Sequence, residues 1–126
     1  QSLDEIREKR DQEQGRSLVL KSNIGVHKIP LNQLMYVEAQ GRKVLYYLAN
    51  GEEIVCTDRF SPVCDQLLQY PEFILAHRSF LVNMNYIRLI STSDMQLQNG
   101  TLLPLAQRRV AEIRKHYLAF QMEEMP

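Results

Sequence analysis

A short polar block, His77-Arg78-Ser79, interrupts the apolar stretch FILAHRSFLVN between Phe73 and Asn83. In a strand, His77 and Ser79 would share one face, and a histidine beside a serine could begin a nucleophilic site. Ser79 lacks the G-x-S-x-G elbow, however, and no other sequence feature supplies an oxyanion hole. We therefore expect no catalytic residues, and we interpret His77 as a side chain that hydrogen-bonds within the fold and orders its loop.

Arg78 needs a different explanation, because its guanidinium group stays charged and must meet water, a carboxylate or a phosphate. Spacing alone leaves a salt bridge and an anion-binding role equally open. The basic pair Arg42 and Lys43 follows Gly41 in a predicted turn, where it could simply be a solubilising group. Arg108 and Arg109 open a predicted helix. Cations there oppose the helix dipole, so this placement favours a phosphate partner.

Length, composition and charge indicate what kind of protein carries these residues. The chain has 126 residues, 44% of them hydrophobic, which is enough for one globular domain with a core. No apolar run approaches the roughly 20 residues of a membrane span. The net charge is zero, but residues 18–120 carry 11 Lys and Arg against 8 Asp and Glu, a net +3. A mildly basic domain is compatible with a nucleic-acid partner.

The two cysteines, Cys56 and Cys64, form no C-x-x-C pair and no cluster with histidine, so we expect neither a metal site nor a cofactor. We expect them to be unpaired core residues in a reducing cytoplasm, although one disulfide is an alternative. Because the sequence begins with Gln1, we expect it to be a piece of a longer protein.

The chain divides into three predicted parts: a linker at residues 1–16, a domain at 17–122 and a short tail at 123–126. The linker is almost entirely polar, and Ser2 with Glu5 is typical of a capping box, so we predict a solvated helix from Ser2 to Gln14.

The domain reads as mostly β, with many short antiparallel strands. Asn50-Gly51 predicts a hairpin with a type I′ turn, and Asn99-Gly100 predicts a second hairpin. A mid-chain helix should begin with Ser61 as N-cap and Pro62 in the first turn, bury Val63, Leu67 and Leu68, and end at Pro71. A C-terminal helix at 106–120 should bury Val110, Ile113 and Tyr117. The expected strands cover residues 18–21, 25–30, 35–39, 43–49, 52–58, 73–76, 80–83, 85–91, 94–98 and 101–105.

The aromatic residues Tyr36, Tyr46, Tyr47 and Phe80 lie within apolar runs, so we expect them in the core. No predicted strand carries the exposed aromatic cluster on which single-stranded bases stack.

Taken in order, these segments resemble the LytTR family of bacterial DNA-binding domains over roughly residues 18–120. The most specific part is the opening stretch, where the family has Phe, then His-Arg-Ser, an apolar pair and Asn. The strand YVEA and the closing LPLAQRR match more loosely, and Ala106 stands where the family usually has serine. The matching residues of the opening stretch are Phe73, His77, Arg78, Ser79, Leu81, Val82 and Asn83.

The resemblance implies an elongated fold that reads duplex DNA with loops rather than with a recognition helix. Arg42, Arg78 and Arg108 would then contact bases, because arginine forms bidentate hydrogen bonds with guanine. Phosphate contacts or loop ordering would come from Lys43, His77, Ser79, Gln107 and Arg109. On this interpretation the polar block is a break between two short strands from which Arg78 leaves the core.

The resemblance also implies a place in a bacterial two-component system. An upstream receiver domain, phosphorylated by a sensor histidine kinase, would make the full-length protein dimeric on activation, so that it binds two direct repeats. The fragment itself would be monomeric, cytoplasmic and without membrane contact. Three alternatives stay open: the same domain attached to a membrane or other sensor, a β-rich protein-interaction module without DNA binding, and a small enzyme using His77.

Overall fold

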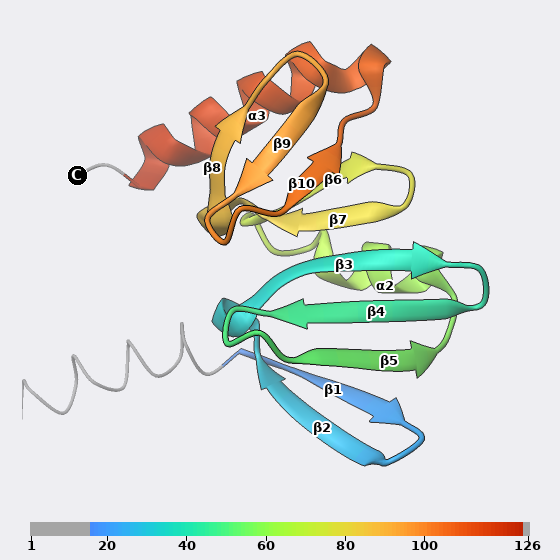
Figure 1. Ribbon diagram of the computed structural model, residues 1–126. Helices are drawn as coiled ribbons and strands as arrows, with labels where there is room; N and C mark the ends of the chain where they lie inside the picture. Colours follow the sequence, from blue (N-terminus) through green and yellow to red (C-terminus); the bar gives the residue numbers. More distant parts are fainter. Residues whose placement is uncertain (1–15, 125–126) are drawn as a thin grey trace, which may run out of the picture.

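The structure is a computed structural model that describes residues 16–124, so the predicted linker helix at 2–14 lies outside the described residues. Within the described part the chain is mostly β, as predicted. It forms ten strands in three antiparallel sheets together with two α-helices (Figure 1). The helices are α2 (Phe60–Leu67) and α3 (Val110–Glu124).

The first sheet is a two-stranded hairpin whose inward side chains, Leu18, Leu20 and Ile29, are buried. The short 3₁₀ helix η1 follows it and leads into the central sheet. These elements are β1 (Ser17–Ser22), β2 (Gly25–Pro30) and η1 (Leu31–Gln33).

The central sheet has five strands in the order β5-β4-β3-β7-β6. Two meanders build it, because β3, β4 and β5 follow one another through turns, and β7 then joins β3. Its strands are β3 (Leu34–Gln40), β4 (Lys43–Leu48), β5 (Glu53–Thr57), β6 (Phe73–His77) and β7 (Phe80–Asn83).

The third sheet, in the order β10-β9-β8, lies with α3 at the other end of the molecule from the first hairpin (Figure 1). The predicted hairpin at Asn99-Gly100 connects β9 with β10. The elements are η2 (Met84–Tyr86), β8 (Ile87–Ile90), β9 (Asp94–Leu97), β10 (Leu102–Pro104) and η3 (Gln107–Arg109).

Two hydrophobic cores lie on the two faces of the central sheet. Strand alternation sends Val37 and Leu81 to the core shared with the first hairpin and α2. The same alternation sends Tyr36 and Val82 to the core shared with the third sheet and α3. The four predicted core aromatics belong to these cores, with Tyr46 2% exposed and Phe80 partly buried. The central sheet is therefore packed on both faces, and the turns that connect its strands are anchored to a well-packed sheet.

The turn after β4 differs from the predicted type I′. That turn needs positive φ at both central residues, but only Gly51 has it, with φ of 92°, and Asn50 does not. Instead Asn50 Oδ1 accepts a hydrogen bond from the Glu52 N–H at 2.8 Å. The asparagine thus closes the turn through its side chain rather than through a left-handed backbone.

The predicted limits of α2 are partly wrong. The helix begins after Arg59 without a side-chain cap, so Ser61 lies inside the first turn rather than at the N-cap, while Pro62 occupies the first turn as predicted. The buried residues are Val63, Cys64 and Leu67, and Leu68 is 42% exposed. The helix ends at Leu67, before Pro71 is reached, and turn residues 68–72 connect it to β6.

The C-terminal helix buries Ile113 and packs Val110 and Tyr117 against the same core, as predicted. It starts later than expected, at Val110 after η3, and extends to Glu124, beyond the predicted end at 120 and beyond the predicted domain limit at 122.

Cys56 and Cys64 are both unpaired and buried, as expected. Burial raises the pKa of the Cys64 thiol to about 11, so this thiol stays protonated at neutral pH.

Candidate nucleic-acid interface

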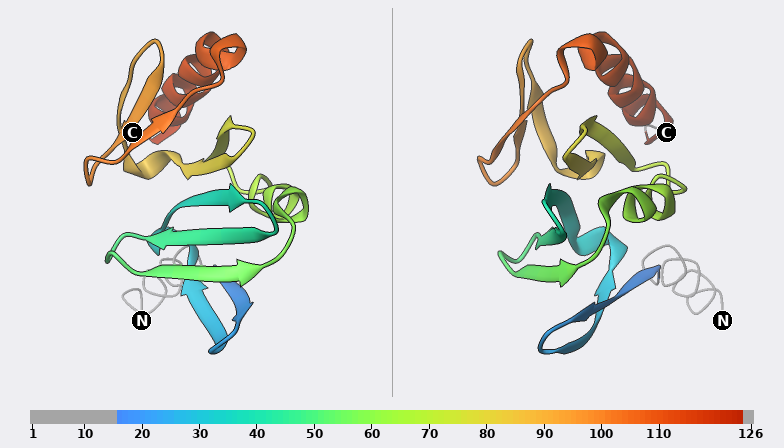
Figure 2. Two further views of the ribbon diagram at one scale, coloured as in Figure 1. Left: turned by 45° about the vertical axis from the view of Figure 1, so that its right-hand side comes forward. Right: turned by 90° about the vertical axis from the view of Figure 1, so that its right-hand side faces the viewer.

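Several turns of the described chain gather along one edge of the molecule, which we call the loop edge. It comprises the β3–β4 turn, the β5–α2 connection, the β6–β7 turn and η3 before α3. All four lie on the right-hand side in Figure 1, and the right panel of Figure 2 views this edge from the front. The loop edge brings together Arg42, Arg78 and Arg108, which are far apart in the sequence and were predicted to act together.

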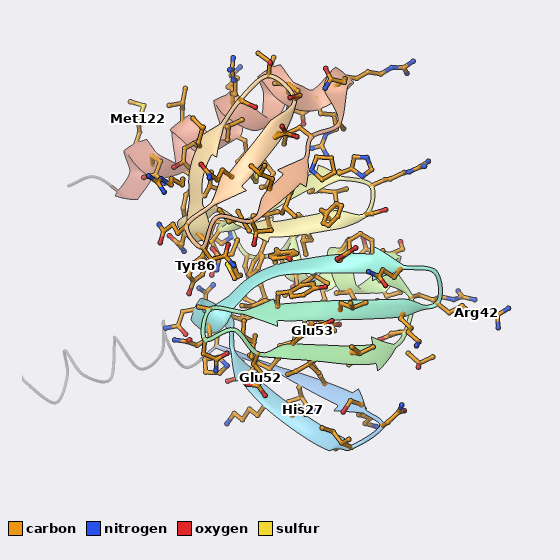
Figure 3. All side chains as sticks on the ribbon, viewed as in Figure 1. His27, Arg42, Glu52, Glu53, Tyr86 and Met122 are labelled. Carbon is orange, nitrogen blue, oxygen red and sulfur yellow. The ribbon has the colours of Figure 1, made fainter. Side chains whose placement is uncertain are left out.

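The β3–β4 turn presents Arg42. Gln40 pairs with Lys43, so only Gly41 and Arg42 lie between the two strands. Gly41 has φ of 60° and Arg42 does not have positive φ, an arrangement that suits a two-residue turn with glycine at its first position. The exposed Arg42 side chain projects from the tip of this turn (Figure 3).

Within the polar block, His77 ends β6 and pairs with Phe80, while Arg78 and Ser79 form the β6–β7 turn. The Ser79 N–H donates to His77 Nδ1 at 3.3 Å, and the His77 ring lies edge-on to Phe80 at 6.0 Å. The His77 imidazole is half-buried between these two contacts. This position suits a side chain that orders the β6–β7 turn. Arg78 is exposed at the tip of the turn. The predicted break between two strands is confirmed for Arg78 and Ser79, and the arginine leaves the core there, but His77 belongs to β6.

The third loop carries Gln107, Arg108 and Arg109 in η3. Gln107 and Arg108 are exposed, whereas Arg109 is half-buried and already bound within the fold. Arg109 Nη1 donates to the Leu75 carbonyl of β6 at 2.5 Å, and Nη2 lies 3.6 Å from Glu112. Arg109 therefore fastens η3 to the edge of the central sheet, a role that the sequence did not predict.

Backbone hydrogen bonds fix the loops relative to one another. The Ala39 N–H donates to the Ser79 carbonyl at 2.9 Å, which ties the end of β3 to the β6–β7 turn. The Ala106 N–H donates to the Ala76 carbonyl at 3.1 Å, which ties the approach to η3 to β6. The three loops that carry the arginines are thus connected through the strands of the central sheet, which fixes the spacing between them.

Charge is distributed unevenly between the two edges of the central sheet. The loop edge carries the exposed cations Arg42, Arg78 and Arg108, and none of them forms an ion pair within residues 16–124. The β4–β5 turn, which carries Glu52, lies at the opposite edge, and Glu53 begins β5 next to it (Figure 3). A polyanion would therefore be attracted to the loop edge and repelled from the other.

Other kinds of site receive no support from the described residues. No group of His, Cys, Asp and Glu among them could hold a metal ion. Among the same residues, no helix is long and apolar enough to cross a membrane. Tyr36 stacks on Tyr47 with ring centroids 4.4 Å apart, but Tyr36 is buried, so the pair is part of the core rather than an exposed platform for bases.

One cation of the loop edge was missed by sequence reasoning. Arg59 lies in the β5–α2 connection, exposed and next to the turn that carries Arg42. The order of the strands could have predicted its place. In an antiparallel meander, β4 runs away from Arg42 and β5 runs back, so Arg59 at the end of β5 must lie at the same edge as Arg42.

The fold and the loop edge define a small β-rich domain that presents cations on short, rigid turns. A family model described as the LytTr DNA-binding domain matches residues 25–118, and the chain belongs to this family of DNA-binding domains. Among solved structures it resembles one described as the LytTr DNA-binding domain of a methyl-accepting/DNA response regulator from Bacillus cereus. The TM-score is 0.67 and the identity 27%, over 79% of this chain and 94% of that one. The search of curated proteins gave no match.

Proposed function

We propose that this chain binds duplex DNA sequence-specifically, as the output domain of a transcriptional response regulator. The observation that carries the proposal is the loop edge, where three exposed arginines without ion-pair partners stand on rigidly connected turns. Arg42, Arg78 and Arg108 contact base edges, since arginine is the side chain best suited to guanine O6 and N7.

The neighbouring polar residues position the domain on the backbone. Lys43, Ser79 and Gln107 contact phosphates, which fix the register without reading sequence. His77 orders the β6–β7 turn through its hydrogen bond with Ser79. Arg109 anchors η3 to β6 through its hydrogen bond with the Leu75 carbonyl, and we assign it a phosphate contact through the N–H groups that this bond does not use.

The proposal extends to the regulatory setting of the full-length protein. A receiver domain precedes the DNA-binding domain in the full-length protein, a sensor histidine kinase phosphorylates it in the bacterial cytoplasm, and the activated dimer occupies direct repeats. The response-regulator description of the Bacillus cereus relative supports this setting.

Salt-dependent binding to duplex DNA tests the proposal. Duplexes selected from a random pool should be bound with a log–log salt slope of about −4 to −5, because about five phosphates are neutralised. A slope near zero, or no duplex binding at low salt, would refute the proposal and leave a protein-interaction module as the better description.

A further inference from the structure

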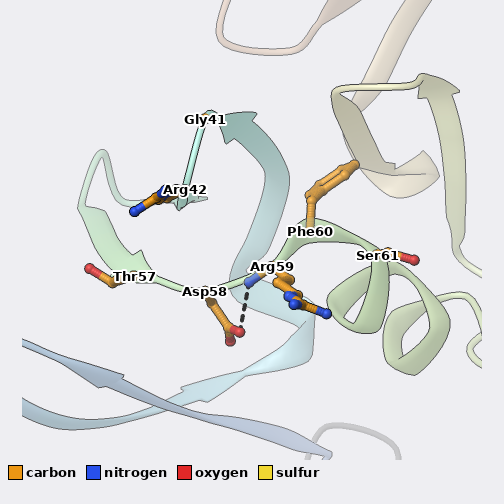
Figure 4. A pocket seen from close by; sticks show the side chains of 7 residues that line it. All are labelled: Gly41, Arg42, Thr57, Asp58, Arg59, Phe60 and Ser61. Carbon is orange, nitrogen blue, oxygen red and sulfur yellow. Dashed lines mark hydrogen bonds between the residues drawn. The ribbon is translucent and has the colours of Figure 1, made fainter.

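An open pocket lies beside Arg42, between the β3–β4 turn and the β5–α2 connection, and has a volume of about 770 Å³ (Figure 4). The proposed contact between Arg42 and a base does not involve this pocket. The residues that line the pocket are Gly41, Arg42, Thr57, Asp58, Arg59, Phe60 and Ser61.

The two walls of this pocket are fixed to one another. The Asp58 N–H donates to the Arg42 carbonyl at 3.1 Å, and Lys43 pairs with Thr57 at the adjoining ends of β4 and β5. A group bound by Arg59 is therefore held at a constant distance from the base contacted by Arg42. Such a fixed spacing is what a contact that sets register requires.

The pocket is positively charged. Its two guanidinium groups, Arg42 and Arg59, form no ion pair within the described residues, and Asp58 is its single carboxylate. Asp58 Oδ1 accepts a hydrogen bond from the Arg59 backbone N–H at 2.7 Å, which ties the carboxylate to its own loop. In Figure 4 this carboxylate points in a different direction from both guanidinium groups. Thr57 and Ser61 add hydroxyl groups that can donate to an anion.

We propose that Arg59 and this pocket bind a backbone phosphate of the DNA strand next to the base contacted by Arg42. The inference rests on the proposed function, because the anion is a phosphodiester that the DNA brings. A guanidinium group suits this ligand, since it offers parallel N–H donors to two phosphate oxygens. Arg59 is thus a positioning contact and carries no sequence preference.

The test compares Arg59→Gln with Arg88→Gln. Arg88 is also an exposed arginine without an ion pair in the described part, but it lies within β8 and not on the loop edge. On a duplex selected with the wild-type chain, Arg59→Gln should make the log–log salt slope shallower by about 0.9. Its base preference should be unchanged. Arg88→Gln should retain the wild-type slope, and far-ultraviolet circular dichroism checks that both variants fold.

Neutral backbone substitutions locate the contact. Replacing single phosphates by methylphosphonate should weaken the wild-type complex beside the base assigned to Arg42, and Arg59→Gln should be insensitive at that position. A wild-type slope and wild-type methylphosphonate sensitivity in Arg59→Gln would overturn this inference while duplex binding itself survives. An altered base preference in Arg59→Gln would also overturn it, by making Arg59 a base reader. A wild-type chain that binds no duplex would overturn both proposals.

Discussion

At the residue scale, arginines that look equivalent in the sequence differ in what they already bind. Arg108 and Arg109 are neighbours, yet Arg108 is exposed without a side-chain partner in the described part, whereas Arg109 bonds to Leu75 and Glu112. Two adjacent residues in a 3₁₀ turn point in different directions, so one faces solvent and the other faces β6. The sequence showed that both residues are cationic, but not which of them would form hydrogen bonds within the fold.

The division between base reading and positioning can be tested by substitution. Arg42→Ala and Arg108→Ala should each weaken binding by about 1–3 kcal/mol and relax preference at separate base positions, because each removes a bidentate pair. Lys43→Ala should weaken all sequences alike. Competition binding against single-base variants of the selected duplex measures both effects. Unchanged specificity in the arginine variants, with altered specificity in Lys43→Ala, would contradict the assignment.

Arg109 should matter for stability where Arg108 does not. Arg109→Ala removes a hydrogen bond from a charged donor to the Leu75 carbonyl, which should lower the free energy of unfolding by about 1–2 kcal/mol. Arg108→Ala should stay within about 0.5 kcal/mol of the wild type, as exposed substitutions usually do. Urea unfolding followed by circular dichroism measures the difference, and equal stabilities would show that Arg109 does not support η3.

At the scale of elements, the sequence predicted the strands and turns better than their exact geometry. Alternating apolar residues and Asn-Gly pairs located the β4–β5 and β9–β10 hairpins. The turn type at Asn50 was wrong because a side-chain hydrogen bond to Glu52 competes with the left-handed backbone. The helix cap at Ser61 was wrong because burial of Val63, Cys64 and Leu67 determines where α2 lies. A local side-chain hydrogen bond decides the first case, and packing of the helix decides the second.

The candidate site was predictable only in part, for a related reason. Arg42, Arg78 and Arg108 stood out because they follow or interrupt apolar strands, and the structure brings their loops to one edge. The pocket beside Arg59 depends on which strand ends lie next to each other. The order of the strands places the end of β5 at the same edge as Arg42, but only the pairing of β4 with β5 forms the pocket between them.

The geometry of the β3–β4 turn should be necessary for binding. Gly41→Ala places a side chain at φ of 60° and should cost about 1 kcal/mol of stability, while displacing Arg42 and lowering DNA affinity several-fold. Gly100→Ala is a matched control, because Gly100 also has positive φ, 92°, and a Cβ there would likewise meet nothing within 4 Å. It lies in the β9–β10 turn at the opposite side of the molecule (Figure 1). Equal affinity losses in the two variants would mean that destabilisation, not Arg42 placement, causes the effect.

At the scale of the whole molecule, the central sheet separates two cores and joins two oppositely charged edges. Because both faces are covered within residues 16–124, neither face of the sheet is open to nucleic acid. Contact with a duplex is left to the loops, and the loop edge is the cationic one. The architecture therefore explains why base reading would depend on turns and not on a helix.

The last prediction concerns how many copies are needed to find one site. Under the proposed function, a single domain offers three base-reading arginines at about 1–3 kcal/mol each. Their combined discrimination, about 3–9 kcal/mol, reaches only at its upper limit the roughly 8 kcal/mol needed to select one position among about 10⁶ competing sites of a genome. A second tethered copy makes the second binding event intramolecular and can raise affinity by about 10² or more without new contacts.

We therefore expect the chain to be monomeric in sedimentation experiments without DNA. We expect the activated full-length protein to bind two correctly spaced direct repeats at least about 100-fold more tightly than a single half-site. Shifting the spacing by half a helical turn should abolish that gain, because the second loop edge would then face away from its groove. A stable dimer of this chain alone would contradict the scheme, because it would place the dimer interface within the DNA-binding domain itself. Equal affinity for one and two half-sites would also contradict it, because tethering would then add nothing to binding.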